Sequence, residues 1–197
     1  MRNWSRFEAL LEKVLKGEAV SEKAWEPYRD RAAILITDLS GFTRLTRELG
    51  APWTLALLLG MRRKAVPILQ AHGGIPVKYQ ADDLFAAFAD PAAALRAALE
   101  LRRAFRAPDP SFPAEVKLCM GIGFGDVIWW GEEDLYGEEV NLASKLGEDT
   151  AGPDEILLTA AAARECLKQG NSPQLVPAGF LTIGEARYEY FRLAGEL

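Results

Sequence analysis

The sequence predicts an α+β fold in which a mostly antiparallel sheet is flanked by helices, an order compatible with a ferredoxin-like core. Three observations predict it. A continuous apolar run at 32–36 is typical of a strand buried on both faces. Two later stretches each have the pattern of two strands joined by a turn. Helical patterns separate these strands, so we expect helices to cover one face of the sheet.

Residues 5–16 predict an amphipathic helix, because Ser5 and Glu8 fit a capping box and one face is apolar. The polar stretch that follows is a connector. We therefore expect a helix and connector at 1–30 and a globular domain at 31–197. The apolar face of the helix suits docking on the domain, an extended dimer interface or a regulatory partner, and the sequence ranks none of these.

The first predicted strand, 32–36, ends just before Asp38. A turn at 40–43 leads into helical sequence, and Pro52 opens a second helix. The later elements are expected, in order, as a hairpin of 75–79 and 84–88 with its tip at 80–83, a helix from Asp90 to about Phe105, a loop at 108–113, a hairpin of 116–122 and 127–130 around 123–126, a helix at 138–146, a strand at 155–159, a helix at 160–167, and a strand pair at 175–183 and 188–193.

Two conspicuous clusters receive a structural interpretation. Trp129 and Trp130 are expected to pack at the second hairpin or at a subunit contact. The basic run at 62–64 is expected to be a solvated helix turn. Neither cluster is assigned a ligand.

Composition and charge exclude several classes of function. One histidine and two cysteines, Cys119 and Cys166, supply too few ligands for a zinc site, so any metal must be held by oxygen atoms. A net charge of −5 and a pI near 5.1 argue against nucleic-acid binding. No apolar run approaches the roughly 20 residues that span a bilayer, and the N-terminus lacks a signal peptide. We therefore expect a cytoplasmic protein without a membrane partner.

Two aspartates stand at positions where a sheet edge is expected. Asp38 follows the buried strand, and Asp82 lies at the tip of the first hairpin. If these strands are neighbours, both carboxylates emerge at the same edge. Hard cations such as Mg²⁺ bind carboxylate and phosphate oxygens, and a pair of them stabilises both the attacking and the leaving oxygen in phosphoryl displacement. Taken alone, each aspartate is better explained as a solvated or capping group.

Four segments carry a family resemblance through both their residues and their order along the chain: Ile36-Thr-Asp-Leu-Ser-Gly-Phe-Thr43, Gly74-Ile-Pro-Val-Lys-Tyr-Gln-Ala-Asp82, Gly121-Ile-Gly-Phe-Gly-Asp126 and Tyr136-Gly-Glu-Glu-Val-Asn-Leu-Ala-Ser-Lys145. They resemble the successive motifs of the class III adenylate and guanylate cyclases, and the resemblance extends from Ala32 to Thr159, with a weaker match in the tail. It implies that 31–197 is a nucleotide cyclase catalytic domain that works as a homodimer. It also implies that each site binds ATP with two Mg²⁺ or Mn²⁺ ions and forms cyclic AMP and pyrophosphate.

The resemblance gives individual residues a role. Asp38 and Asp82 would hold the metal ions, and Lys78 and Asp134 would bind the adenine base from the opposite subunit. A lysine donates to adenine N1 and an aspartate accepts from its amino group, whereas guanine matches neither group. Backbone groups of the turn after the first aspartate would approach the triphosphate, and they belong to Leu39, Ser40, Gly41, Phe42 and Thr43.

Asn141 and Lys145 are the expected catalytic groups. They lie four residues apart on the predicted helix at 138–146, so they project on one side of it. The resemblance implies that they orient the substrate and support the charge that develops on the phosphate.

Three positions depart from the family pattern. The family has arginine where Lys145 stands and lysine where Ile183 stands, and Ala81 replaces the glycine that usually precedes the second metal aspartate. Lysine keeps the charge but loses the planar fork of donors, and alanine at position 81 is costly if its φ is positive. These departures predict an adenylate cyclase of low activity. Two other functions remain as alternatives. One is an inactive nucleotide-binding regulatory module, and the other is a guanylate cyclase, which Lys78 and Asp134 oppose.

Overall fold

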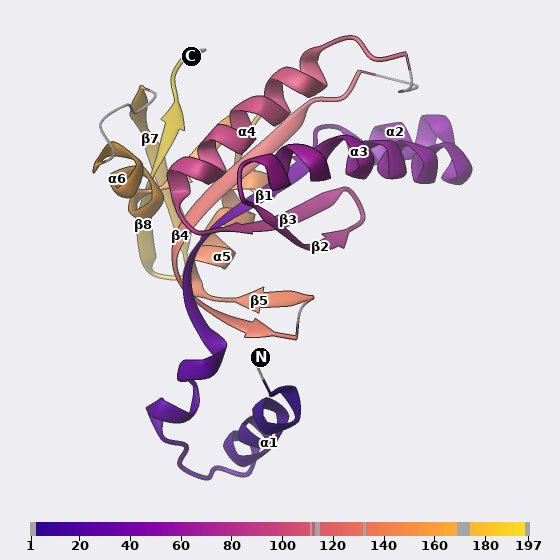
Figure 1. Cartoon of the computed structure of the whole chain (residues 1–197). Coiled ribbons are helices and arrows are strands. Elements are labelled where there is room, and N and C mark those ends of the chain that lie inside the picture. The colour runs from indigo at the N-terminus through magenta and orange to yellow at the C-terminus, as the bar shows by residue number, and fades with distance from the viewer. Residues whose placement is uncertain (1–2, 111, 113–114, 132, 169–173, 196–197) are drawn as a thin grey trace.

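The computed structural model describes residues 3–110, 112, 115–131, 133–168 and 174–195. Figure 1 shows a sheet crossed by helices, with α1 set apart at one end. The elements are α1 (Trp4–Leu15), β1 (Arg29–Leu39), α2 (Phe42–Leu49), α3 (Ala51–Ala71), β2 (Ile75–Gln80), β3 (Asp83–Phe88), α4 (Pro91–Arg106), β4 (Leu118–Trp130), β5 (Asp134–Tyr136), α5 (Glu138–Ser144), β6 (Ile156–Thr159), α6 (Ala160–Lys168), β7 (Leu175–Ile183) and β8 (Ala186–Leu193). Two 3₁₀ turns (Glu22–Ala24 and Glu26–Tyr28) precede β1, and a π-helical turn (Lys145–Thr150) follows α5.

Within these described ranges the strands form one sheet of eight, in the order β2-β3-β1-β4-β6-β8-β7, with β5 paired to the end of β4. Every pair is antiparallel except β4 with β6. The predicted mostly antiparallel α+β fold is therefore confirmed. Of the expected loop at 108–113, residues 111 and 113 lie outside the described residues.

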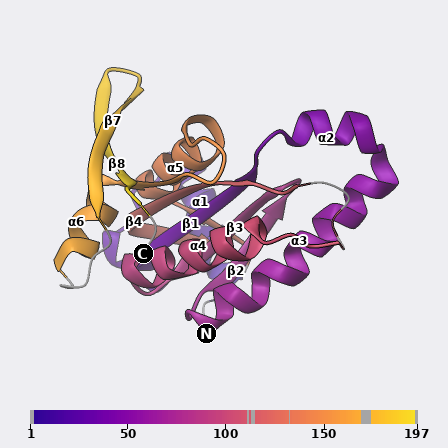
Figure 2. The ribbon, with the colours of Figure 1, turned by 90° about the horizontal axis from the view of Figure 1, so that it is seen from above.

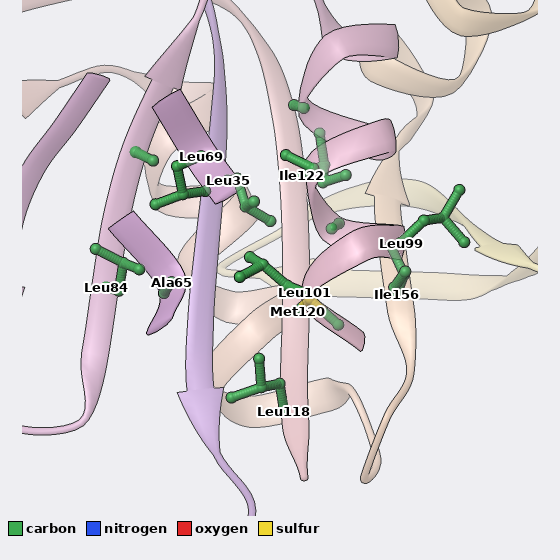
Figure 3. Close-up of a cluster of buried hydrophobic side chains, with 14 of the residues drawn as sticks. Leu35, Ala65, Leu69, Leu84, Leu99, Leu101, Leu118, Met120, Ile122 and Ile156 are labelled. Atoms are coloured by element: carbon green, nitrogen blue, oxygen red, sulfur yellow. The ribbon is translucent and has the colours of Figure 1, made fainter. Parts of the chain in front are cut away.

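Helices cover both faces of the sheet, so the expectation that they cover one face is wrong. On one face, Leu35 and Ile122 pack in a large core with Leu69 and residues of α4 and α6 (Figures 2 and 3). On the other face, Ile36 packs with Ala143 of α5. The reason lies in the sequence of β1, because a run that is apolar at every position leaves both faces to be covered.

The second predicted hairpin is also wrong, because 118–130 forms the single strand β4. Its glycines make no turn. A Cβ atom on Gly121 would come within 2.1 Å of the carbonyl oxygen of Ala143, and one on Gly123 within 2.3 Å of that of Glu139. The glycines therefore allow the backbone of α5 to lie directly on the strand.

The N-terminal helix packs against its own chain. It begins after Asn3, whose side chain accepts a hydrogen bond from the Arg6 amide at 3.0 Å, so the expected cap at Ser5 is wrong by two residues. Phe7 packs in a small cluster with Tyr28, and its ring centroid lies 6.1 Å from that of Trp130. The helix thus contacts the end of β4 through its side chains.

Two side-chain interpretations change with the structure. Trp129 is buried in the core on the α5 side of the sheet, whereas Trp130 is half exposed. The run at 62–64 is no solvated turn, because the Arg62 guanidinium lies 4.4 Å from the Tyr79 ring centroid and Lys64 Nζ lies 2.8 Å from an Asp109 carboxylate oxygen. In the described part of the chain, every helix is too short or too polar to cross a membrane.

Candidate functional site

The two predicted metal aspartates lie together at one edge of the sheet. Asp38 is the penultimate residue of β1, and Asp82 lies at the tip between β2 and β3. Because β1 pairs with β3, with Thr37 opposite Leu84, the hairpin tip comes beside the end of β1. The Leu39 amide donates to Asp82 Oδ2 at 3.3 Å, which ties the two segments together.

Burial and crowding shape the electrostatics of this edge. Burial, reinforced by the neighbouring Asp82, raises the pKa of Asp38 to about 6. Burial also raises the pKa of Asp82. A third carboxylate, Asp83, joins them, and burial together with the nearby Glu148 raises its pKa to about 7. Sequence reasoning missed Asp83, although its place next to Asp82 at a hairpin tip was a signal.

The donor set fits a divalent cation of the Mg²⁺ or Mn²⁺ kind. Carboxylate oxygens are the preferred ligands of such ions, and in the described part of the chain no cationic side chain forms a hydrogen bond or ion pair with these carboxylates. Within the described chain, no group of three or more His, Cys, Asp and Glu side chains is arranged as a complete metal cage. An ion held by these carboxylates would need further ligands, which solvent or a bound phosphate can supply.

The turn after Asp38 presents a helix start. Gly41 has a φ of +78°, and no side chain caps the first turn of α2. The amides of Leu39 and Ser40 already donate, to Asp82 and to the Lys117 carbonyl oxygen. The amides of Gly41, Phe42 and Thr43 therefore remain as the candidates for an anion, while the Phe42 side chain packs against the core.

Lys78 and Asp134 form an ion pair, with Lys78 Nζ 2.8 Å from Asp134 Oδ1. The ammonium group also lies 4.5 Å from the ring centroid of Phe85. Asp134 accepts two more hydrogen bonds, from the Leu135 amide at 2.8 Å and from the Tyr136 hydroxyl at 3.0 Å. Burial acts to raise the pKa of Asp134, but the hydrogen bonds, led by that of Lys78, leave the pKa below its usual value.

Asn141 and Lys145 are both exposed on the outer side of the α5 segment. The inner side is fixed by Val140 and Ala143 and by Gly147, where a Cβ atom would lie only 3.1 Å from the Ile36 carbonyl oxygen. Lys145 begins the π-helical turn, and its ammonium group lies 2.5 Å from Asp149.

Ile183, where the family has lysine, stands 41% exposed at the end of β7. The chain therefore brings Asp38 to Asp82 and Lys78 to Asp134. Among the described residues, no hydrogen bond or ion pair joins these two pairs to each other or to Asn141.

Comparison with known proteins assigns this arrangement to a class. No family model matches the chain. The chain is 33% identical to an adenylate cyclase of Streptomyces griseus over 144 residues. The aligned region covers 73% of this chain and 35% of that protein. An adenylate cyclase of Streptomyces coelicolor is 34% identical over 143 residues, which covers 73% of this chain and 36% of that protein. The chain thus spans about a third of the length of these curated relatives.

Solved structures share the fold. The catalytic core of a rhodopsin-guanylyl cyclase with converted specificity, in complex with ATPalphaS, superposes with a TM-score of 0.75 at 15% identity, covering 86% of this chain and 99% of that one. The adenylate/guanylate cyclase/hydrolase of Silicibacter pomeroyi gives a TM-score of 0.71 at 24% identity, with the same coverage of 86% and 99%. The fold is thus that of nucleotide cyclase catalytic domains. With the sequence relatives, it shows that the chain belongs to the class III adenylate and guanylate cyclases.

Proposed function

We propose that the chain is an adenylate cyclase domain that converts ATP to cyclic AMP and pyrophosphate at the interface of a homodimer. The observation that carries the choice of ATP is the Lys78–Asp134 pair, whose atoms lie 2.8 Å apart in the isolated chain. Curated relatives named adenylate cyclases support it. Neighbouring solved structures include the guanylyl cyclase core with converted specificity in complex with ATPalphaS and a non-canonical dimeric guanylyl cyclase domain.

At the metal edge, Asp38 and Asp82 are the residues that would hold two Mg²⁺ or Mn²⁺ ions. Such ions, when bound, supply charge stabilisation for the attacking and the leaving oxygens of a phosphoryl displacement. Because no side chain caps the start of α2, the amides of Gly41 to Thr43 are the proposed donors to the phosphate oxygens. In the reaction, the ribose 3′-hydroxyl loses its proton and its oxygen attacks the α-phosphate, and the bond to the pyrophosphate oxygen breaks.

The base is selected by a donor and an acceptor. Lys78 has an ammonium hydrogen to donate to adenine N1, and Asp134 has a carboxylate oxygen to accept from the adenine amino group. Guanine has a hydrogen at N1 and an oxygen at position 6. The Lys78 donor would then face the N1 donor, and the Asp134 acceptor would face the O6 acceptor. Unpaired polar groups of this kind cost enough to reject a base strongly.

Asn141 and Lys145 of the other subunit are proposed to act on the sugar and the phosphate. Asn141 is exposed and offers an amide to orient the ribose. Lys145 offers a positive charge to the phosphate under attack, but Asp149 already holds that charge at 2.5 Å. Turnover is therefore expected to be slow.

The test is a cyclase assay on the purified chain with ATP and Mn²⁺, in which cyclic AMP and pyrophosphate are both measured. Asp38→Ala is the inactive control, and GTP is run in parallel. Mixed dimers test the shared site, with Asp38→Ala in one chain and Asn141→Ala in the other. One intact site should survive in the mixture, and complete loss would contradict the homodimer.

A second candidate is a regulatory module that binds nucleotide without turnover, which the Lys145–Asp149 pair and the exposed Ile183 favour. ATP with Mn²⁺ should raise the melting temperature in either case, but only the enzyme releases pyrophosphate. If GTP outcompetes ATP as substrate, the domain is instead a guanylate cyclase.

A further inference from the structure

The Asp134 carboxylate has almost all of its acceptor capacity in use. Oδ1 accepts from Lys78 Nζ and from the Leu135 amide, each at 2.8 Å. Oδ2 accepts from the Tyr136 hydroxyl at 3.0 Å. A carboxylate has about four acceptor positions in total. The position that remains is on Oδ2, beside the Tyr136 hydroxyl.

Tyr136 is itself held on the β4–β5 ribbon. Asp134 and Tyr136 are two residues apart on β5, so their side chains leave the strand on the same side. The Tyr136 ring centroid lies 5.8 Å from that of Trp130, and Trp130 in turn contacts Phe7 of α1. Strand pairing of Ile128 with Tyr136 fixes the backbone beneath the ring. The hydroxyl thus points at Asp134 from a supported side chain that has few rotatable bonds.

We propose that Tyr136 is a positioning residue that sets the preference for adenine over guanine by aiming the last acceptor position of Asp134 at the base. This inference rests on the proposed adenylate cyclase function. With both carboxylate oxygens anchored, the carboxylate has one orientation to offer, in which it accepts from an amino group and repels the oxygen of guanine. Without the Tyr136 hydroxyl, Oδ2 can rotate away or accept from water, and the repulsion of guanine weakens.

The experiment measures binding without turnover. Isothermal titration of the full chain with 3′-deoxy-ATP and 3′-deoxy-GTP, in the presence of Mn²⁺, gives the ratio of the two dissociation constants, because neither nucleotide has the hydroxyl needed for cyclisation. Tyr136→Phe should reduce the preference for the adenine nucleotide by roughly 5- to 10-fold, the effect of one typical hydrogen bond. The ratio of kcat/KM for ATP and GTP should fall by the same factor.

Tyr188→Phe is the matched control. The Tyr188 hydroxyl donates to a Glu138 carboxylate oxygen at 2.7 Å, so this variant also removes one tyrosine–carboxylate hydrogen bond. It should leave the ratio unchanged. Tyr136 is 49% exposed, and a melting curve confirms that Tyr136→Phe folds.

The outcomes separate this inference from the proposed function. An unchanged ratio in Tyr136→Phe, or an equal fall in Tyr188→Phe, overturns the role of Tyr136. A wild-type chain that shows no preference for the adenine nucleotide overturns that role together with the adenylate specificity. A wild-type chain that prefers adenine and loses the preference in Tyr136→Phe, yet forms no cyclic AMP, supports the role while the catalytic proposal fails.

Discussion

The proposed base-binding pair (Lys78 and Asp134) and the proposed metal edge (Asp38, Asp82 and Asp83) are both built from charged side chains, but their charges are balanced in opposite ways. Asp134 has a cation and two further donors on its carboxylate, and its pKa lies below the usual value. At the metal edge, Asp38 lies beside Asp82 and Asp83, and burial with mutual repulsion raises the pKa of Asp38 to about 6. The Asp134 carboxylate is paired within the chain, whereas the carboxylates of the metal edge carry negative charge that no cation among the described residues neutralises.

This difference indicates where protein partners satisfy the charged groups and where the charged groups crowd one another. Groups that are satisfied by protein partners keep their geometry before substrate arrives. Crowded buried carboxylates destabilise the folded chain until a cation binds. The backbone beside the metal edge is also strained, because Ala81, directly before Asp82, has a left-handed φ of +52°.

The largest effect is expected from removing one carboxylate at the metal edge. Asp38→Asn should reduce cyclic AMP formation by at least about 100-fold, because a metal ligand is lost. It should also raise the melting temperature in EDTA, because one of the repelling charges is gone.

Cyclic AMP formation is assayed with Mn²⁺, and the melting temperature is measured in EDTA, on the same protein preparations. Asp134→Asn is the contrasting variant, since removing that carboxylate breaks a satisfied pair and should lower the melting temperature. If Asp38→Asn melts below the wild type in EDTA, the carboxylates do not repel one another in the way described.

A smaller effect is expected from restoring the family's guanidinium at the α5 segment. Lys145→Arg should raise kcat by roughly 10-fold, because a planar fork binds phosphate through two hydrogen bonds and is less fully occupied by Asp149. Lys168→Arg is the matched control, since Lys168 is an exposed lysine that pairs with Glu165 at 2.7 Å. An unchanged kcat in Lys145→Arg would show that position 145 does not limit turnover.

The sequence predicts the metal edge because its signals are local. An apolar run ends at Asp38, and two β-prone runs enclose the turn at 80–83, so β1 and the β2–β3 hairpin are confirmed. Where the signals depend on tertiary contacts, the predictions fail. Gly123 and Gly125 resemble turn residues, but the structure uses them to admit the backbone and side chain of Glu139 against β4.

The same limit applies to individual side chains. Lys78 and Asp134 are far apart in the sequence. Their common role was predicted from the family resemblance and not from spacing, and the structure brings the two side chains together. Asp83 was missed because period-two alternation places it on the opposite side from Asp82, whereas at a hairpin tip that alternation breaks down. The contact of Tyr136 with Asp134 depends on the short strand β5, which the sequence analysis did not predict, although a spacing of two residues on a strand places both side chains on one side.

The strained turn at the metal edge gives a stability prediction. Ala81→Gly should stabilise the chain by roughly 0.5–1 kcal/mol, because relief of a left-handed φ outweighs the entropy that glycine loses on folding. Urea unfolding measures the change. Ala71→Gly in the last turn of α3, where φ is helical, is the control and should destabilise by about 0.5–1 kcal/mol. Equal destabilisation of both variants would contradict strain at position 81.

The smallest expected effect is the pH dependence of the stability that the Lys78–Asp134 pair provides. Burial acts to raise the pKa of Asp134, but hydrogen bonds from Lys78, Leu135 and Tyr136 lower it below its usual value of about 3.9. A lowered folded-state pKa means that the stabilisation is present above the unfolded-state pKa and is lost as the pH falls through the folded-state pKa. The free energy of unfolding of the wild type relative to Asp134→Asn should therefore be constant from pH 7 to about 5 and decline below about 4. Because the pair is partly exposed, the decline should be no more than about 1 kcal/mol. A difference that stays flat to the lowest pH at which both proteins fold would show that the three hydrogen bonds do not favour the charged carboxylate, and the contrast with the metal edge would disappear.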